Sequence, residues 1–159
     1  MTNAFRSPSS VFSIADNLRR VKESIAQAAL KAGRDPAEVT LIAVSKGHPA
    51  EMVIEAAQAG QTVFGENRVQ EAEGKIADCG IRIAEQNANA PLRNQKSEIR
   101  NLSWHLIGHL QTNKAKTAVA LFDMIHSVDS VRLAQEISRH ATNLGKTMPV
   151  LLEVNVSGE

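Results

Sequence analysis

Apolar and polar positions along the chain follow two periods in turn, which predicts helices alternating with strands. Residues 11–28 place apolar side chains three and four positions apart, the spacing of one helix face, and Gly33 followed by Asp35-Pro36 ends that helix. Short apolar runs bounded by turn residues come next. We expect strands at residues 39–45, 62–64, 103–107, 124–126 and 150–156.

Between these strands, the apolar residues have the spacing of helices. The expected helices run from Pro49 to Gly60, from Val69 to near Gly80, from Gln111 through Val119, and from a cap at 127–130 through Leu144. Residues 81–101 lose this spacing and are polar and rich in turn residues, so we interpret them as a surface insertion. The length of 159 residues fits a single domain, 1–159.

Strand alternates with helix four times and a fifth strand follows, a pattern that predicts an α/β protein with parallel strands. Two architectures share the pattern. In a doubly wound open sheet, five strands make a complete domain, whereas in a (β/α)₈ barrel they make a little over half. Periodicity alone leaves both open.

Composition narrows the class of protein. Hydrophobic residues make up 43% and charged residues 22%, as in a globular protein, and the net charge of +1 gives no electrostatic case for nucleic acid or a membrane surface as partner. The single cysteine, Cys79, suits a reducing compartment, and the first ten residues lack the apolar stretch of a signal peptide. We therefore expect a cytoplasmic protein.

The candidate chemistry lies where the expected strands end. Lys46 closes the apolar run 41–45, and a lysine desolvated at such a point is a nucleophile toward aldehydes. Asn67, Gly108-His109 and Ser127 follow the next three strands, and Asn155 lies in the fifth. Each is singly an ordinary loop or cap residue. Together on one rim of a parallel sheet, they suit a small polar ligand with an electrophilic carbon.

The sequence lacks the motifs of several common functions. No Gly-x-Gly-x-x-Gly or Walker loop follows the first strand, and no Gly-x-Ser-x-Gly elbow occurs. His105 and His109 have the spacing of zinc ligands on a helix, but they begin in a strand and lack the accompanying glutamate. We therefore expect no metal site.

Five blocks of residues carry a family resemblance. They are 41–49 (LIAVSKGHP), 64–71 (FGENRVQE), 104–114 (WHLIGHLQTNK), 125–130 (IHSVDS) and 150–159 (VLLEVNVSGE). In this order they resemble the pyridoxal phosphate homeostasis protein family. The resemblance implies a partial (β/α)₈ barrel of about five parallel strands, similar to the N-terminal barrel of alanine racemase and preceded by an extra helix.

The resemblance also implies a cofactor and a role. Lys46 would hold pyridoxal 5′-phosphate (PLP) as an internal aldimine, and Asn67 would lie beside the ring; His105 and Asn155 complete the expected cofactor-binding residues. The implied function is non-catalytic: buffering the cofactor inside the cell or delivering it to partners such as apo PLP enzymes. A PLP-dependent barrel enzyme such as an amino-acid racemase is one alternative, although the chain has no tyrosine to offer as an acid or base. An open-sheet interaction module without cofactor is another.

Members of that family continue beyond the fifth-strand block, with residues that hold the phosphate. The resemblance therefore implies a C-terminally truncated member, either a gene fragment or an incomplete record. Three missing strands would leave two open sheet edges. For this reason we expect the polypeptide alone to be marginally stable and to bind the cofactor weakly or not at all.

Overall fold

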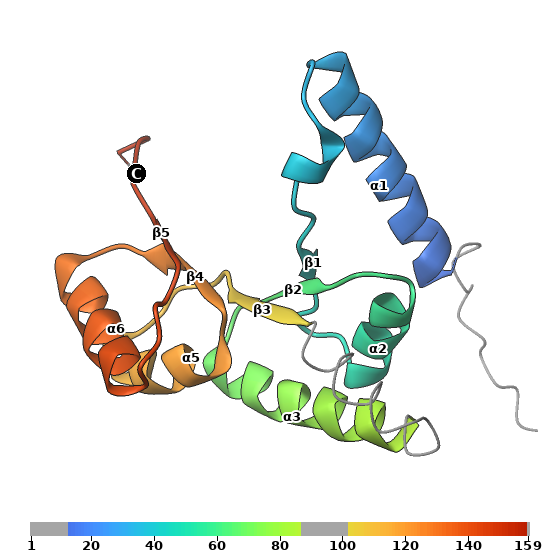
Figure 1. The fold of residues 1–159 in the computed structure, drawn as a ribbon. Helices are drawn as coiled ribbons and strands as arrows, with labels where there is room; N and C mark the ends of the chain where they lie inside the picture. The colour runs from blue at the N-terminus through green and yellow to red at the C-terminus, as the bar shows by residue number, and fades with distance from the viewer. Residues whose placement is uncertain (1–12, 87–101, 159) are drawn as a thin grey trace, which may run out of the picture.

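The strands of the sheet stand in space in the same order as in the sequence. The computed structural model describes residues 13–86 and 102–158, and within them five parallel strands pair in the order β1-β2-β3-β4-β5 (Figure 1). The strands are β1 (Ala43–Val44), β2 (Val63–Glu66), β3 (Ser103–Leu106), β4 (Met124–Val128) and β5 (Val150–Leu152). The helices are α1 (Ile14–Lys31), α2 (Ala50–Gln58), α3 (Val69–Gln86), α5 (Ala115–Leu121) and α6 (Val131–Asn143).

This strand order decides between the two architectures. A doubly wound sheet reverses its strand order at a switch point, and no reversal occurs along the five described strands. The helices also follow one another in space, since α2 packs on α3, α3 on α5 and α5 on α6 (Figure 1). The prediction of a partial (β/α)₈ barrel with about five parallel strands is thus confirmed, and the described strands do not have the order of a doubly wound sheet.

Alternate residues of the strands face the two sides of the sheet. Phe64, Trp104, Leu106 and Ile125 are at most 6% exposed and join apolar residues of the helices in one core. Phe64 and Trp104 lie side by side on neighbouring strands, with ring centroids 5.4 Å apart. His105, which lies between Trp104 and Leu106 in sequence, is only half-buried, because the described helices cover the other face.

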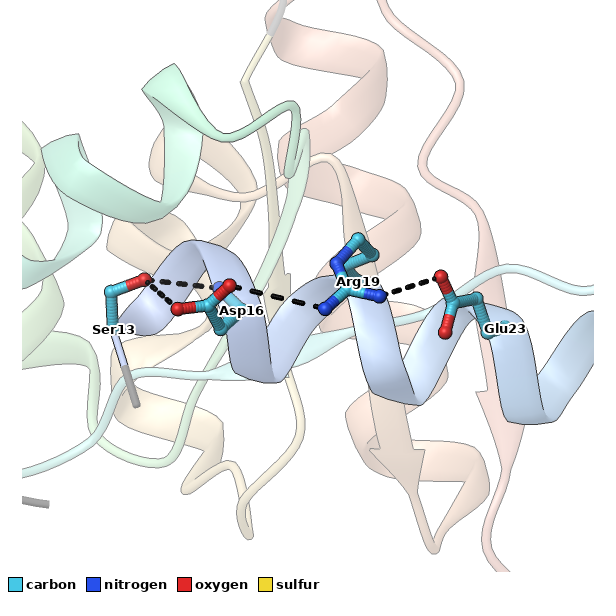
Figure 2. Close-up of polar contacts among 4 residues, drawn as sticks. All are labelled: Ser13, Asp16, Arg19 and Glu23. Atoms are coloured by element: carbon cyan, nitrogen blue, oxygen red, sulfur yellow. Dashed lines mark hydrogen bonds and ion pairs between the residues drawn. The ribbon is translucent and has the colours of Figure 1, made fainter. Parts of the chain in front are cut away.

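Helix α1 precedes the sheet, as predicted. It packs against α2, and its Ile14 and Leu18 lie against the core. Ser13 caps the helix by accepting a hydrogen bond at Oγ from the N–H of Asp16 (3.1 Å). Figure 2 shows this cap continuing along the exposed face through Arg19, whose Nη1 lies 2.9 Å from Glu23 Oε1. Such exposed ion pairs contribute little, so the apolar face holds α1 in place.

The edge strands are shorter than the apolar runs that predicted them. The expected strand 39–45 pairs only at Ala43–Val44, because the buried Gln61 side chain donates from Nε2 to the carbonyls of Leu41 (2.8 Å) and Val63 (2.7 Å) in place of a backbone ladder. The expected strand 150–156 ends at Leu152, because β4, its neighbour among the described strands, ends at Val128.

Helix α3 is longer than expected. It passes Gly80 and ends at Gln86, so the first six residues of the expected insertion 81–101 belong to this helix. A glycine inside a helix costs only about 1 kcal/mol, which packing of the helix on α2 and β2 offsets. The rest of the insertion, 87–101, lies outside the described residues. Among the described helices, none has the length and apolar character needed to cross a bilayer.

Candidate functional site

Lys46 and Asn67 follow the carboxyl-terminal ends of the neighbouring strands β1 and β2. Val44 is paired with Gly65 in the parallel register, so the residues two positions further on, Lys46 and Asn67, leave the sheet at the same level. Ser45 faces the helix layer, where it is buried, and alternation therefore directs Lys46 toward the face that the described helices leave open. Lys46 is exposed and Asn67 half-buried. The rim thus joins an accessible amine to an amide.

The backbone that follows β3 lies so close to Asn67 that residue 108 has no room for a side chain. A Cβ added to Gly108 would lie 2.4 Å from the carbonyl oxygen and 2.8 Å from the Cα of Asn67. The carbonyl of Gly108 in turn accepts a 2.6 Å hydrogen bond from the Ser127 hydroxyl at the end of β4. Residues from β2, β3 and β4 therefore fix one another at the carboxyl ends of the strands, where barrel proteins place their ligands.

A buried ion pair lies directly behind Lys46. Glu66 is fully buried, and its Oε1 accepts hydrogen bonds from Lys75 Nζ (2.6 Å) and from the Ser45 hydroxyl (2.7 Å). Lys75 reaches this point from α3, and its side chain is 10% exposed. Its Nζ also donates to the carbonyl of Ser45 (2.6 Å). The residue before Lys46 is thus tied to both β2 and α3.

Two histidines form a pair one layer below the rim. His105 is opposite Gly65 in the register, and its Nδ1 lies 3.0 Å from Nε2 of His126 on β4, while its Nε2 lies 3.1 Å from Ser103 Oγ. Partial burial lowers the pKa of both imidazoles, and for His105 the neighbouring His126 lowers it further. In the described ranges no third His, Cys, Asp or Glu joins them as a metal site would require.

Asn155 lies at the other side of the described sheet. It follows β5, whereas Lys46 follows β1, and β2, β3 and β4 stand between these two strands. Its Oδ1 accepts a hydrogen bond from the N–H of Gly158 (2.9 Å), which closes a turn after the strand. The register thus puts Lys46 and Asn67 at one level after neighbouring strands and His105 on the next strand, whereas Asn155 follows the strand at the other edge of the described sheet. The cofactor roles of all four residues stay predictions.

Comparison with known proteins assigns the chain to a family. Residues 12–159 match the model of the alanine racemase N-terminal domain. The chain belongs to the alanine racemase N-terminal domain family. It is 38% identical over 146 residues to the pyridoxal phosphate homeostasis protein of Escherichia coli K12 and 42% identical to that of Pseudomonas aeruginosa. These matches cover 92% of this chain and 56% of each relative, so the chain spans about half the length of the curated relatives it matches.

Solved structures in the comparison share the family fold. PipY of Synechococcus elongatus PCC7942, solved with PLP bound, superposes with a TM-score of 0.64 at 42% identity, covering 91% of this chain and 55% of PipY. PipY without PLP gives a TM-score of 0.69 at 41% identity, with 91% and 54% covered. A crystal structure of a protein from Bifidobacterium adolescentis gives a TM-score of 0.75 at 39% identity, covering 92% of this chain and 56% of that protein.

Within this family fold, sequence reasoning missed Glu66 and Lys75. Both had a readable signal. Glu66 is a charged residue inside a run that forms a buried strand, and Lys75 lies three residues after Ala72 and four before Cys79, on the buried face of α3. A charge at each of these positions requires a partner, and each is the other's partner.

Proposed function

We propose that this chain provides the PLP-binding lysine of a pyridoxal phosphate homeostasis protein, and that Lys46 holds the cofactor for buffering or delivery. One observation carries the proposal. The parallel register of β1 and β2, continued by two residues, puts the exposed Lys46 and the half-buried Asn67 at one level of the rim where barrel folds bind ligands, and this supports the proposal. The homeostasis proteins named above and PipY with PLP bound support the choice of cofactor.

The residues at the rim fit the aldehyde end of this cofactor. PLP supplies an aldehyde carbon that reacts reversibly with amines. Lys46 would supply the amine that condenses with that carbon, a C=N bond would replace the C=O bond, and the oxygen would leave as water, so no oxidant or reductant is needed. Asn67 offers an amide donor and acceptor next to that position. The chemistry of the donor set therefore matches the group.

A carrier role, rather than catalysis, is part of the proposal. The relatives' name, homeostasis protein, supports it, and we propose apo PLP enzymes in the cytoplasm as recipients. Incubating the chain with PLP and L-alanine, and measuring D-alanine over time, tests the catalytic alternative. Steady formation of D-alanine above the level with free PLP would refute the carrier role.

Reductive trapping tests the role of Lys46. The 159-residue protein is mixed with PLP and reduced with borohydride, which captures even weakly held cofactor, and the labelled lysines are identified by peptide mass spectrometry. We expect Lys46 to carry most of the label, well above the exposed Lys116 on α5. Lys46→Ala should remove this label, whereas the matched variant Lys116→Ala should leave it unchanged. Equal labelling of Lys46 and Lys116 would refute the proposal.

A further inference from the structure

The backbone that leads into Lys46 is held by more contacts than a strand end requires. The N–H of Ser45 donates to the carbonyl of Gly65 (3.0 Å), as in a sheet ladder. Its carbonyl accepts two further hydrogen bonds, from Lys75 Nζ (2.6 Å) and from the N–H of His48 (3.1 Å). Its hydroxyl is bound by Glu66. Every polar group of Ser45 is therefore engaged.

These contacts act on Lys46 through the peptide bond. The carbonyl of Ser45 and the N–H of Lys46 belong to one planar group, so fixing the direction of that carbonyl fixes the plane from which the Lys46 Cα and side chain project. Lys75 makes the shortest contact to this plane, and it comes from α3, thirty positions along the chain. A tertiary contact therefore helps to fix the peptide plane from which Lys46 projects.

The Glu66–Lys75 ion pair directs its hydrogen bonds at each other and at Ser45. Lys75 Nζ already donates to two acceptors in a buried setting, so it is not an accessible amine. Glu66 Oε2 has no hydrogen-bond partner in the part of the chain that the structure describes, and the hydrogen bonds from Ser45 and Lys75 both meet at Oε1. Burying two charges is costly, and apolar residues of similar size often stabilise a fold as well. Stability alone is thus a weak reason for this pair.

We propose that Lys75, with Glu66 as its counter-charge, is a positioning residue that clamps the Ser45 carbonyl and thereby aims the Lys46 amine at its aldehyde ligand. This inference rests on the proposed function of Lys46. It assigns Lys75 no contact with the ligand. Its effect passes through the Ser45–Lys46 peptide group.

Replacing the clamp, which consists of Ser45, Glu66 and Lys75, with apolar residues separates an effect on the position of Lys46 from an effect on the stability of the fold. The variant Ser45→Ala/Glu66→Leu/Lys75→Met replaces the three polar side chains of the clamp with apolar ones of similar volume. The backbone carbonyl of residue 45 can still accept its hydrogen bond from the N–H of His48. The control is Arg82→Met. Arg82 lies on α3, as Lys75 does, and this change removes its exposed 2.9 Å ion pair with Glu51 of α2. Three quantities are measured: the urea unfolding curve, hydrogen exchange of the 46–48 amides, and the ratio of trapped PLP on Lys46 to that on Lys116.

We expect the apolar variant to unfold cooperatively like the wild type, with 46–48 amide exchange about tenfold faster. The Lys46-to-Lys116 labelling ratio should fall by about tenfold or more, since small misplacements of reacting groups have effects of this size. Arg82→Met should match the wild type. An unfolded apolar variant, or one with unchanged exchange or an unchanged ratio, would overturn the proposal. Wild-type protein without selective Lys46 labelling would refute the proposed function instead, and the exchange measurement would still decide whether the clamp orders the turn.

Discussion

Gly108→Ala should damage the rim more than its single added carbon suggests. The new Cβ would lie 2.4 Å from Asn67 O, 2.8 Å from its Cα and 3.0 Å from its carbonyl carbon. All three are backbone atoms, so no side-chain rotation relieves the overlap, and the ends of β2 and β3 must separate. The Ser127 bond to the Gly108 carbonyl resists that movement. Overpacking of this kind costs about 1–3 kcal/mol.

Urea unfolding followed by circular dichroism measures this cost, and Gly74→Ala provides the matched control. Gly74 lies in α3, and a Cβ there meets nothing within 4 Å. Alanine at that position should stabilise the protein by about 0.5–1 kcal/mol, because glycine is the poorer helix former. The two identical substitutions should thus have opposite signs. A Gly108→Ala protein within about 0.5 kcal/mol of the wild type would refute the close approach of β3 to Asn67.

Two further predictions concern titratable groups. Burial raises the pKa of the Cys79 thiol to about 11, so a thiol reagent at neutral pH should modify it in urea and leave the native protein unmodified; rapid native labelling would contradict its burial. Burial lowers the pKa of His105 and His126 below 6.5, so the unfolded chain binds protons first as pH falls. The free energy of unfolding should therefore decrease below about pH 6.5, and less steeply in His126→Gln, which keeps a hydrogen-bonding side chain beside His105; parallel pH profiles would contradict this.

The alternation of strands and helices could be predicted from the sequence because each element carries its own period. The runs around Phe64, Trp104 and Ile125 each became a strand, and the Ser130 cap begins α6 as expected. Pairing partners determine strand ends, and no local pattern encodes them. Gln61 replaces the ladder next to Leu41, and β5 stops where β4 stops, so both edge strands were predicted too long.

The candidate site, too, has some features that the sequence could predict and others that depend on tertiary packing. Lys46 and Asn67 could be predicted to share one rim because parallel strands bring their carboxyl ends together, and the register of β1 and β2, continued by two residues, agrees with this. The choice between barrel and open sheet required the strand order, which helical and strand periods do not contain. The pairing of Glu66 with Lys75 depends on how α3 packs on β2, a tertiary fact that each residue's own neighbours do not reveal.

The environment of Lys46 arises from a short part of the chain. Ser45, Glu66, Asn67 and Lys75 come from β1, β2 and α3, and the hydrogen bonds that join Ser45, Glu66 and Lys75 are internal to residues 45–75. Gly108 and Ser127 then hold Asn67 from the β3 side. The contacts that surround the backbone before Lys46 therefore come from the first two strand–helix units of the described sheet, with β3 and β4 as their support. If so, variants at Lys75 and Gly108 should affect Lys46 by separate routes, through its own peptide plane and through Asn67, and their effects on cofactor labelling should add in free energy.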